Sequence, residues 1–300
     1  MQVFRHLPIQ QPAAMALAIG NFDGLHLGHK ALLTKLVDTA KSKGVIPAVM
    51  TFEPHPREFF APHAAPARLS SMREKLEYFE EAGVEKVFVC RFNQVFASIS
   101  AQLFMQDILR KHLNANVILV GGDFCFGAKR QGTAQSFIDH GFDLVDFPPV
   151  EVAGERVSST LVRNALAEGD LIRAESLLGR PYSISGKVVH GAKRGRQLGY
   201  PTANVHMRHE RPALTGVYAV KLNGLNGVAN LGVRPTIAGV PKLMLEVYVF
   251  DFNGNLYDQH VHVQFFHKVR DEMKFESLDA LKAQIAKDVI VASDYFKNQS

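Results

Sequence analysis

Cysteine is scarce in this chain. Cys90 and Cys125 are the two cysteines among 300 residues, and neither forms a C-x-x-C pair or a cluster with histidine. Zinc is held by several such ligands at short spacing, so no zinc site is expected. Both cysteines stand in apolar surroundings, which indicates small core residues in a reducing compartment. We therefore expect a cytoplasmic protein.

Long apolar runs and charge runs are also absent. No stretch approaches the roughly 20 apolar residues that span a bilayer. The N-terminus lacks the basic flank and apolar core of a signal peptide. The 34 lysines and arginines are scattered along the chain, and no internal repeat or low-complexity tract occurs. These absences favour a soluble protein without a membrane partner.

The composition is that of an ordinary globular protein. Hydrophobic residues make up 47% of the chain and charged residues 21%, so disorder is not expected. A length of 300 residues predicts about two domains. The net charge of +5 favours acidic ligands such as nucleotides, and it would also suit nucleic acid. Charge alone leaves both possibilities open.

The first half alternates between strand and helix signals. This alternation predicts an α/β fold with a doubly wound parallel sheet and right-handed crossovers. Proline and histidine interrupt the pattern at 54–66, which indicates either a mobile loop over a nucleotide site or an irregular surface connection. The expected strands are 15–19, 45–52, 84–92, 116–121 and 142–147, and the main helices are 30–43, 71–82 and 100–113.

The second half changes to strands and turns. A helical segment at 158–178, interrupted near Gly169, precedes Arg180-Pro181, so we place domains at 1–179 and 180–300. Asn-Gly pairs at 223–224 and 253–254 predict hairpins. A small antiparallel β-barrel with a C-terminal helix at 277–296 follows from these signals. The expected barrel strands are 182–189, 217–222, 243–250 and 256–266.

Residues 17–30, which read L-A-I-G-N-F-D-G-L-H-L-G-H-K, join an expected strand to an expected helix. Ligands bind at such crossings in open α/β sheets. Glycine lets the backbone approach a ligand closely, and a helix N-terminus offers N–H groups to phosphate. His26 and His29 would project from one face of the first helical turn and could donate hydrogen bonds to phosphate oxygens. The alternative is a glycine-rich turn with two surface histidines.

The string G-N-F-D-G-L-H-L-G-H resembles the phosphate-binding signature of the nucleotidylyltransferase superfamily, and its lead-in is similar to that of the FMN adenylyltransferase branch. The resemblance implies that His26 and His29 act on the triphosphate of ATP. The residues that it assigns to ATP and phosphate binding are Gly20, Asn21, Phe22, Asp23 and Gly28.

Two further segments of the first half could hold phosphate. The loop V-G-G-D-F-C-F-G at 120–127 follows a strand, so Asp123 and Phe124 could contact FMN, or the phenylalanines could instead fill the core. Ser159 and Thr160 open a helix with Arg163 one turn later, which fits phosphate binding as well as ordinary helix capping. Nucleotidylyltransferases that this chain resembles use an S-S-T-x-x-R element for the leaving phosphates, which gives Arg163 a catalytic role.

The second half contains a basic, glycine-containing string at 193–204, K-R-G-R-Q-L-G-Y-P-T-A-N. Such a loop could cradle phosphates, or it could be a basic surface loop. Thr202 and Asn204 present oxygen ligands at extended spacing. A neutral pair is a weak magnesium site by itself, because Mg²⁺ also takes charged phosphate oxygens and water. The site would therefore form only with ATP bound.

The string G-x-x-L-G-Y-P-T-A-N resembles the riboflavin kinase signature. Further kinase-like strings follow in family order at 215–218, 228–236, 251–252 and 269–275. The resemblance implies that Thr202 and Asn204 bind Mg²⁺ and that Glu246 is the base for the ribityl 5′-hydroxyl. It also assigns ATP or flavin binding to seven residues: Gly195, Arg196, Gly199, Pro201, Tyr218, Asn230 and Arg270.

The strand pattern places Glu246 opposite Leu245 and Val247, so the alternative is a solvent-facing glutamate. Two positions depart from the family pattern. Tyr248 stands where the family typically has histidine, and Asp258 stands where it has glycine. Glu246, Thr202 and Asn204 all match the family.

Taken end to end, the chain resembles the prokaryotic bifunctional riboflavin kinase/FAD synthetases. The resemblance implies that riboflavin is phosphorylated by MgATP to FMN, and that FMN is adenylylated by a second ATP to FAD. The expected partners are riboflavin, FMN, FAD and ATP, with Mg²⁺ and no nucleic acid, in a monomer or weak homo-oligomer. Two alternatives remain: an adenylyltransferase whose barrel only binds flavin, and a nucleic-acid-binding module that uses loop 193–196, whose binding would be steeply salt dependent.

Overall fold

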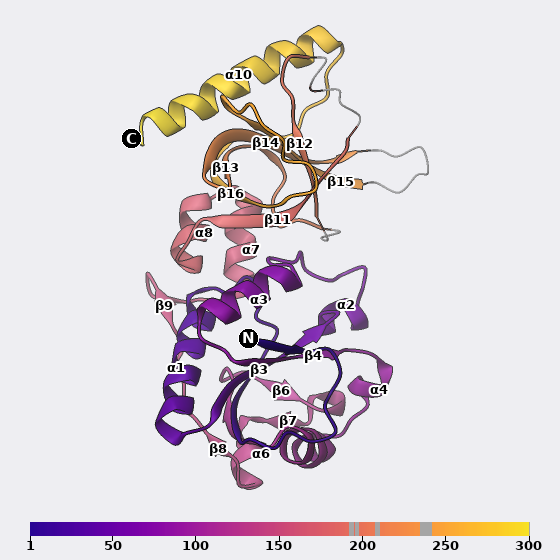
Figure 1. Ribbon diagram of the computed structural model, residues 1–300, viewed down its shortest axis with the longest axis vertical. Coiled ribbons are helices and arrows are strands. Elements are labelled where there is room, and N and C mark those ends of the chain that lie inside the picture. The colour runs from indigo at the N-terminus through magenta and orange to yellow at the C-terminus, as the bar shows by residue number, and fades with distance from the viewer. Residues whose placement is uncertain (192–194, 196–197, 208–210, 235–241, 300) are drawn as a thin grey trace. The chain divides into compact units, whose positions relative to one another are not determined.

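The computed structural model describes residues 1–191, 195, 198–207, 211–234 and 242–299. Its contacts divide the chain into two compact units, drawn in Figure 1. The N-terminal unit comprises Met1–Pro66 and Met72–Ser158, and the C-terminal unit comprises Ala67–Ser71 and Ser159–Ser300. None of the helices in the described part of the chain combines the length and apolar character that a bilayer crossing requires.

A six-stranded sheet forms the centre of the N-terminal unit. Its order is β1-β4-β3-β2-β5-β8, and every neighbouring pair is parallel. The predicted doubly wound parallel sheet is thus confirmed. Its strands are β1 (Gln2–Phe4), β2 (Met15–Ile19), β3 (Ile46–Glu53), β4 (Lys86–Arg91), β5 (Ala115–Leu119) and β8 (Asp143–Leu144).

Both faces of this sheet are covered. Met15, Leu17 and Ile19 of β2 face one hydrophobic cluster, whereas Ala16 and Ala18 face the other. Burial on both faces explains why β2 is a continuous apolar run rather than an alternating one. The helices of this unit are α1 (Leu27–Lys43), α2 (Pro56–Phe60), α3 (Met72–Glu81), α4 (Gln94–Ala97), α5 (Ala101–Leu103), the π-helical η1 (Phe104–His112), the 3₁₀ turn η2 (Ala128–Arg130) and α6 (Ala134–Asp139).

The interruption at 54–66 is more ordered than we predicted. It contains α2, whose N-terminus is capped by His55. The N–H of Arg57 donates to His55 Nδ1 at 3.1 Å, and the N–H of His55 donates to the Glu58 carboxylate at 3.1 Å. Four short strands also escaped the sequence patterns, because two residues show no periodicity: β6 (Cys125–Phe126), β7 (Gly132–Thr133), β9 (Glu151–Val152) and β10 (Glu155–Arg156).

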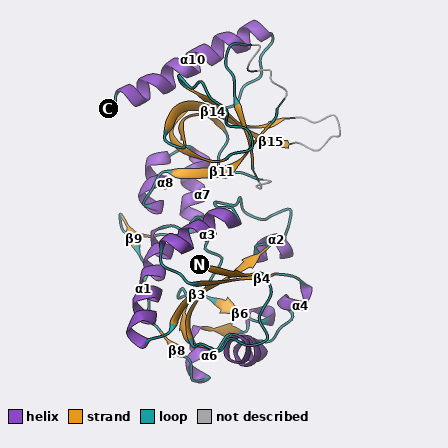
Figure 2. Cartoon of the chain, in the orientation of Figure 1, coloured by secondary structure: helices purple, strands orange, loops and turns teal. Residues whose placement is uncertain are grey.

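The C-terminal unit contains the predicted antiparallel barrel, with its strands in orange in Figure 2. The barrel is closed in the order β11-β12-β15-β14-β13-β16. Its interior is lined by residues at alternate positions, such as Val261, Val263 and Phe265. The strands are β11 (Tyr182–Val189), β12 (Ala203–His206), β13 (Gly216–Leu222), β14 (Leu225–Arg234), β15 (Lys242–Val249) and β16 (His260–Arg270).

Three helices accompany the barrel. The predicted C-terminal helix is confirmed as α10 (Leu278–Lys297), and it packs on the outside of β13 and β14 through Ala292 and Phe296. Helices α7 (Ser159–Glu168) and α8 (Leu171–Leu178) are separated at Gly169, as the sequence indicated. Both belong to the C-terminal unit. A domain boundary at 179/180 stays a prediction.

One predicted hairpin is right and the other is wrong. Asn223-Gly224 joins β13 to β14, which pair directly. Asn253-Gly254 does not form a hairpin, because β15 pairs with β12 and β14 while β16 pairs with β11 and β13. In the closed barrel, β15 and β16 each already have a partner on both sides. They therefore cannot pair with each other, whatever the turn residues between them favour.

Two candidate active sites

In the N-terminal unit, the loops that follow β2 and β5 lie at one edge of the sheet. The two strands are parallel neighbours, so their carboxyl ends meet at this edge. The loop after β2 carries the glycine and histidine motif, and the loop after β5 carries Asp123. Ligands bind at this place in open α/β sheets. The fold therefore brings together two segments that the sequence singled out separately.

His26 and His29 form a compact pair at the start of α1. His26 caps the helix, and its Nδ1 accepts the N–H of His29 at 3.4 Å. The two rings stack with their centroids 3.8 Å apart. The expectation that both project from one face of the first turn is confirmed. Together with the positive end of the helix dipole at the start of α1, they form a surface suited to an anion.

Glycine is required beside this pair. A Cβ on Gly28 would stand only 3.2 Å from two ring atoms of His26, so any side chain there would disturb the cap. A Cβ on Gly20 would stand 3.2 Å from the ring of Phe22. Phe22 packs against both His29 and Phe79, with centroids 5.2 Å away in each case. The loop therefore depends on small residues at both positions.

Lys75 is a residue of this region that the sequence did not single out. It lies on α3, and only 4% of its surface is exposed. Its Nζ donates to the carbonyl oxygen of Asn21 at 2.8 Å, an oxygen that also accepts the Thr51 hydroxyl at 3.4 Å. A lysine on an amphipathic helix is typical of a solvated face, so no pattern in the sequence could have identified it.

The electrostatic surroundings of His29 disfavour a positive charge. Its pKa lies well below the ordinary value, first because the ring is buried and then because His26 and Lys75 carry like charge. Among the described residues, the buried atoms His29 Nδ1 and Asn21 Oδ1 have no hydrogen-bond partner. Unpartnered buried polar atoms in a loop of this kind are consistent with a site that is completed by a ligand.

The loop after β5 is held in place by its own contacts. Asp123 accepts a hydrogen bond from Arg156 Nη2 at 2.8 Å, and this bond holds the pKa of the Asp123 carboxyl below its usual value. Phe124 stacks on Phe126 and Phe137 with centroids 5.8 and 6.4 Å away. Phe126 thus fills the core, and the half-buried Phe124 packs against it. A role of Asp123 and Phe124 toward FMN stays a prediction.

Ser159, Thr160 and Arg163 lie in the first two turns of α7, which belongs to the C-terminal unit. The Nε of Arg163 donates to the carbonyl oxygen of Ala67 at 2.6 Å. This bond fixes the segment Ala67–Ser71 to α7 within that unit. The binding of leaving phosphates by Ser159, Thr160 and Arg163 stays a prediction.

In the C-terminal unit, the strand register collects four sequence-predicted residues in one row. Asn204 of β12 pairs with Glu246 of β15, and Glu246 pairs with Asn230 of β14. The row continues through Val217 of β13 to Arg270 of β16. Directly opposed residues project from the same face of a sheet. Leu245 and Val247, which flank Glu246, are fully buried in the barrel, so Glu246 faces outward as predicted and is half-buried there.

The predicted metal ligands stand at the beginning of β12. Asn204 is 7% exposed, and a Cβ on Gly191 would collide with its amide group. Thr202 precedes the strand, and its hydroxyl lies 3.1 Å from the place that a Cβ on Gly195 would occupy. The carbonyl of Gly195 accepts the N–H groups of Leu198 and Tyr200. A glycine therefore lies close to each of the two predicted metal ligands, where a side chain would crowd it.

The remaining residues assigned to ATP or flavin differ in their surroundings. Gly199 has a positive φ of 88°, and Pro201, two residues later, is exposed. Arg196 lies outside the described residues. Tyr218 is inside the barrel, where its hydroxyl donates to the carbonyl of Thr215 at 2.8 Å and burial raises its pKa to about 12. Its proposed contact with a ligand stays a prediction.

Arg270 is engaged by a partner that the sequence did not indicate. Its Nε and Nη2 donate to both carboxylate oxygens of Asp288 at 2.8 to 3.1 Å. Asp288 lies on α10, is 3% exposed, and also accepts a hydrogen bond from Gln284 at 2.9 Å. The ion pair ties the end of β16 to α10. Any contact of Arg270 with a nucleotide would involve an already paired guanidinium.

The two departures from the family pattern have local explanations. Tyr248 packs edge-on against Tyr200, with ring centroids 5.3 Å apart. Asp258 has a positive φ of 65°, a conformation that favours glycine and is tolerated by aspartate. Its carboxylate pairs with Lys187 at 2.8 Å, which lowers the pKa of Asp258. The positive φ at Asp258 thus accounts for the glycine of the family pattern, and Tyr248 is part of a local aromatic contact.

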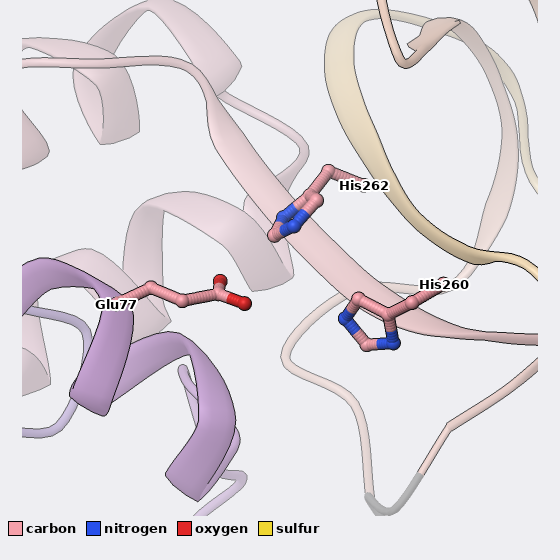
Figure 3. Close-up of side chains that lie close together, drawn as sticks. All are labelled: Glu77, His260 and His262. Atoms are coloured by element: carbon pink, nitrogen blue, oxygen red, sulfur yellow. The ribbon is translucent and has the colours of Figure 1, made fainter.

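Figure 3 shows a histidine pair on the barrel. His260 and His262 are two residues apart on β16, with ring centroids 5.4 Å apart. They are register partners of Lys187 and Ser185 on β11. Glu77, drawn in the same figure, belongs to α3 of the N-terminal unit. Within the C-terminal unit, two imidazoles do not complete the usual ligand set of a metal site.

Comparison with known proteins gives matches along nearly the whole chain. The family model described as FAD synthetase matches residues 9–161, and the one described as riboflavin kinase matches residues 178–296. Curated proteins named bifunctional riboflavin kinase/FMN adenylyltransferase are similar to it. The Escherichia coli K12 protein is 47% identical over 93% of this chain and 92% of its own length. The Pseudomonas fluorescens protein is 47% identical over 97% of each.

A solved structure supports the fold. The crystal structure of a Streptococcus pneumoniae protein described as a macrolide-efflux protein superposes with a TM-score of 0.80. It is 32% identical to this chain and covers 96% of it, and the chain covers 97% of that structure. The two proteins therefore share both parts of the architecture.

Proposed function

Because this chain belongs to the family of bifunctional riboflavin kinase/FMN adenylyltransferases, we propose that it performs its two reactions at two separate sites. The enzyme phosphorylates riboflavin to FMN with ATP and adenylylates FMN to FAD with a second ATP. We assign adenylylation to residues 1–179 and phosphorylation to residues 180–300. The observation that supports this division is that the histidine pair lies in one unit and the Asn204–Glu246–Asn230 row in the other.

In the adenylyltransferase, the groups that meet the triphosphate are positive or are hydrogen-bond donors. His26 and His29, with the backbone of the loop from Gly20 to Gly28, bind the phosphates at the start of α1. Ser159, Thr160 and Arg163 hold the leaving pyrophosphate. The attacking FMN phosphate is already ionised at neutral pH, so no strong base is required. The site acts by positioning the reactants and neutralising developing charge.

We place the flavin nucleotide of this reaction against the loop that follows β5. Asp123, fixed by Arg156, keeps this loop in shape. Phe124 presents an aromatic surface beside Phe126. Asn21, Phe22 and Asp23 complete the opposite wall of the site, in the loop after β2.

In the kinase, the nucleophile is an alcohol, and a base must accept its proton. Glu246 has this role. It stands in the middle of the outward-facing row, between Asn204 and Asn230. The carboxylate takes the proton of the ribityl 5′-hydroxyl as the oxygen attacks the terminal phosphate of ATP. The glycine-containing loop with Gly195, Arg196, Gly199 and Pro201 binds ATP, and the row of Asn230 and Arg270, with Tyr218, completes the ATP and flavin site.

The residues at the start of β12 fit a magnesium ion that arrives with ATP. Thr202 offers a hydroxyl and Asn204 an amide oxygen, and the carboxylate of Glu246 is the register partner of Asn204. Neutral oxygens of this kind suit Mg²⁺ when phosphates supply the charge. When bound, the ion would neutralise charge on the phosphates. Gly195 and Gly191 lie close to Thr202 and Asn204, where a larger side chain would crowd these two residues.

We further propose that the enzyme works in the cytoplasm, where both reactions find ATP, as a monomer or weak homo-oligomer and without nucleic acid. Sedimentation equilibrium tests the oligomeric state. FAD formation that is insensitive to moderate salt supports the last point, since binding to a phosphate backbone is steeply salt dependent.

The experiment that tests the function is a single incubation. The purified chain is mixed with riboflavin and MgATP, and riboflavin, FMN and FAD are separated over time. We expect FMN to appear first and FAD to follow. An enzyme that converts supplied FMN to FAD but leaves riboflavin unchanged would instead be an adenylyltransferase with a flavin-binding barrel.

A further inference from the structure

Lys75 places a buried ammonium group beside the loop that carries Asn21 and Phe22. Its side chain is 4% exposed, and burying an ammonium is costly unless its hydrogen bonds are satisfied. Here Nζ donates to the Asn21 carbonyl at 2.8 Å. Asn21 and Lys75 are far apart in the sequence, so this bond fastens the loop after β2 to helix α3.

The same ammonium acts on His29. The ring of His29 lies between His26 and Phe22, and its Nδ1 is buried without a hydrogen-bond partner among the described residues. Like charges on His26 and Lys75 add to burial in lowering the pKa of His29. The same two elements also carry buried carboxyl groups, those of Asp23 and Glu74.

We propose that Lys75 is a positioning residue of the adenylyltransferase, which fixes the loop at Asn21 and, together with burial and His26, keeps His29 uncharged until a polyphosphate enters. The proposal rests on the proposed function, in which His29 meets the phosphates of ATP. When the polyphosphate arrives, its negative charge opposes that of Lys75, and the imidazole of His29 takes one proton from solvent at its unprotonated ring nitrogen. Phosphate binding is then coupled to uptake of one proton.

This coupling disfavours protonation of His29 before the polyphosphate binds. An imidazolium formed in the empty loop would be repelled by Lys75 and His26 and would displace the loop. An imidazolium formed against phosphate gains a charge-assisted hydrogen bond. Burial, His26 and Lys75 together therefore favour a positive charge on His29 only where it contacts phosphate.

The test observes the ring of His29 directly. The full-length enzyme is labelled in its 13 histidines, the His29 signals are assigned with His29→Gln, and they are titrated by NMR with and without inorganic pyrophosphate. The variants are Lys75→Met, which removes the charge while retaining an apolar stem, and Lys75→Arg, which retains the charge. Lys35→Met on α1 is the matched control, because Lys35 is exposed.

In the parent enzyme, we expect a neutral His29 at pH 7 that becomes protonated when pyrophosphate is added. Lys75→Met should raise the proton affinity of free His29, because it removes one of the like charges that lower it, whereas Lys75→Arg and Lys35→Met should leave it close to that of the parent. The rate of FAD formation by Lys75→Met should fall. Its pH profile should also shift toward higher pH, because His29 would stay protonated to a higher pH. A merely structural lysine would lower the rate without moving the profile.

Two different failures can be told apart. If His29 is already protonated at pH 7 in the free parent, or if Lys75→Met leaves its proton affinity unchanged, the role of Lys75 is overturned. The parent titration alone decides the first point, so the proposal stays testable even if Lys75→Met does not fold. If saturating pyrophosphate moves neither the His26 nor the His29 signals, the assignment of the phosphate site itself fails, and the inference fails with it.

Discussion

The two candidate sites are assembled in opposite ways. The phosphate loop of the N-terminal unit consists of neighbours in sequence, because residues 20–29, which span the loop after β2 and the start of α1, contain the glycines, Asn21 and both histidines. The kinase row of the C-terminal unit is assembled by strand register, which aligns Asn204, Glu246 and Asn230 from three different strands. A local motif can be recognised directly in a sequence, whereas a row across a barrel becomes visible only when the strand order is known.

The two proposed sites also differ in their chemistry. In our proposal, the first binds its ligand with helix N–H groups and imidazoles, and its nucleophile is an ionised phosphate. The second is centred on a carboxylate, and its nucleophile is a hydroxyl that must lose a proton. If this contrast is correct, single substitutions should abolish one reaction and leave the other intact.

The largest effect is expected for His29→Ala. Loss of one imidazole from the phosphate site removes about 2–4 kcal/mol of transition-state stabilisation, so FAD formation from FMN should fall roughly 10²–10³-fold. Phosphorylation of riboflavin should survive. Both rates are measured on the same preparation, with His140→Ala, an exposed histidine of the same unit, as the control. Equal loss of both activities in a folded protein would argue against separate sites.

Glu246→Gln should have the opposite effect. Glutamine keeps the size and some of the hydrogen bonding but accepts no proton at neutral pH, so the kinase rate should fall roughly 10²-fold or more. The affinities for riboflavin and MgATP should change far less, and FAD formation from supplied FMN should continue. Glu168→Gln, at an exposed position of α7, serves as the control. A kinase rate within a few-fold of the parent would make Glu246 a solvated surface residue.

A smaller effect, and one on stability, is expected for Asp288→Asn. The carboxylate of Asp288 accepts hydrogen bonds from Arg270 and Gln284 in a largely buried position, and removing its charge leaves the guanidinium without a counterion. We expect a loss of about 2 kcal/mol in the free energy of unfolding of the C-terminal unit. Denaturant titration measures it against Asp294→Asn, on the exposed side of the same helix. Equal stability of the two variants would show that the ion pair does not anchor α10.

The smallest effect is expected for Asp258→Gly, which restores the family residue. Glycine suits the positive φ of this position, and the ion pair that it removes is fully exposed, so the thermal midpoint should move by no more than about 2 °C. Lys187 lowers the pKa of Asp258 below 3.8, so the small contribution of the pair is present at neutral pH and is lost as the pH falls through that lowered pKa. A large loss of stability at pH 7 would reveal a further role for Asp258.

Much of the fold followed from patterns in the sequence. The buried run of β2, the helix stop at Gly44 and the turn at Asn223-Gly224 were all readable, because each depends on residues close in sequence. The hairpin at Asn253-Gly254 was predicted wrongly, since strand order around a closed barrel is not a local property. The two-residue strands β6, β7, β9 and β10 could not be predicted, as they carry no period.

The site was predictable to a similar degree. The stack of His26 on His29 and the outward direction of Glu246 follow from helical and strand periodicity. Lys75 and Asp288 did not stand out, because a charged residue on a helix normally faces solvent, and only tertiary packing shows that these two are buried. The partner of Arg270 was missed for the same reason.

The most direct test of two independent sites is complementation by mixing. His29→Ala and Glu246→Gln are each incubated with riboflavin and MgATP, first separately and then together. Each variant alone should form little FAD, because one lacks the adenylylation step and the other the phosphorylation step. The mixture should form FAD efficiently, since FMN released by His29→Ala is adenylylated by Glu246→Gln. A mixture no better than the separate variants, while each retains its own half-reaction, would contradict independent sites linked by free FMN.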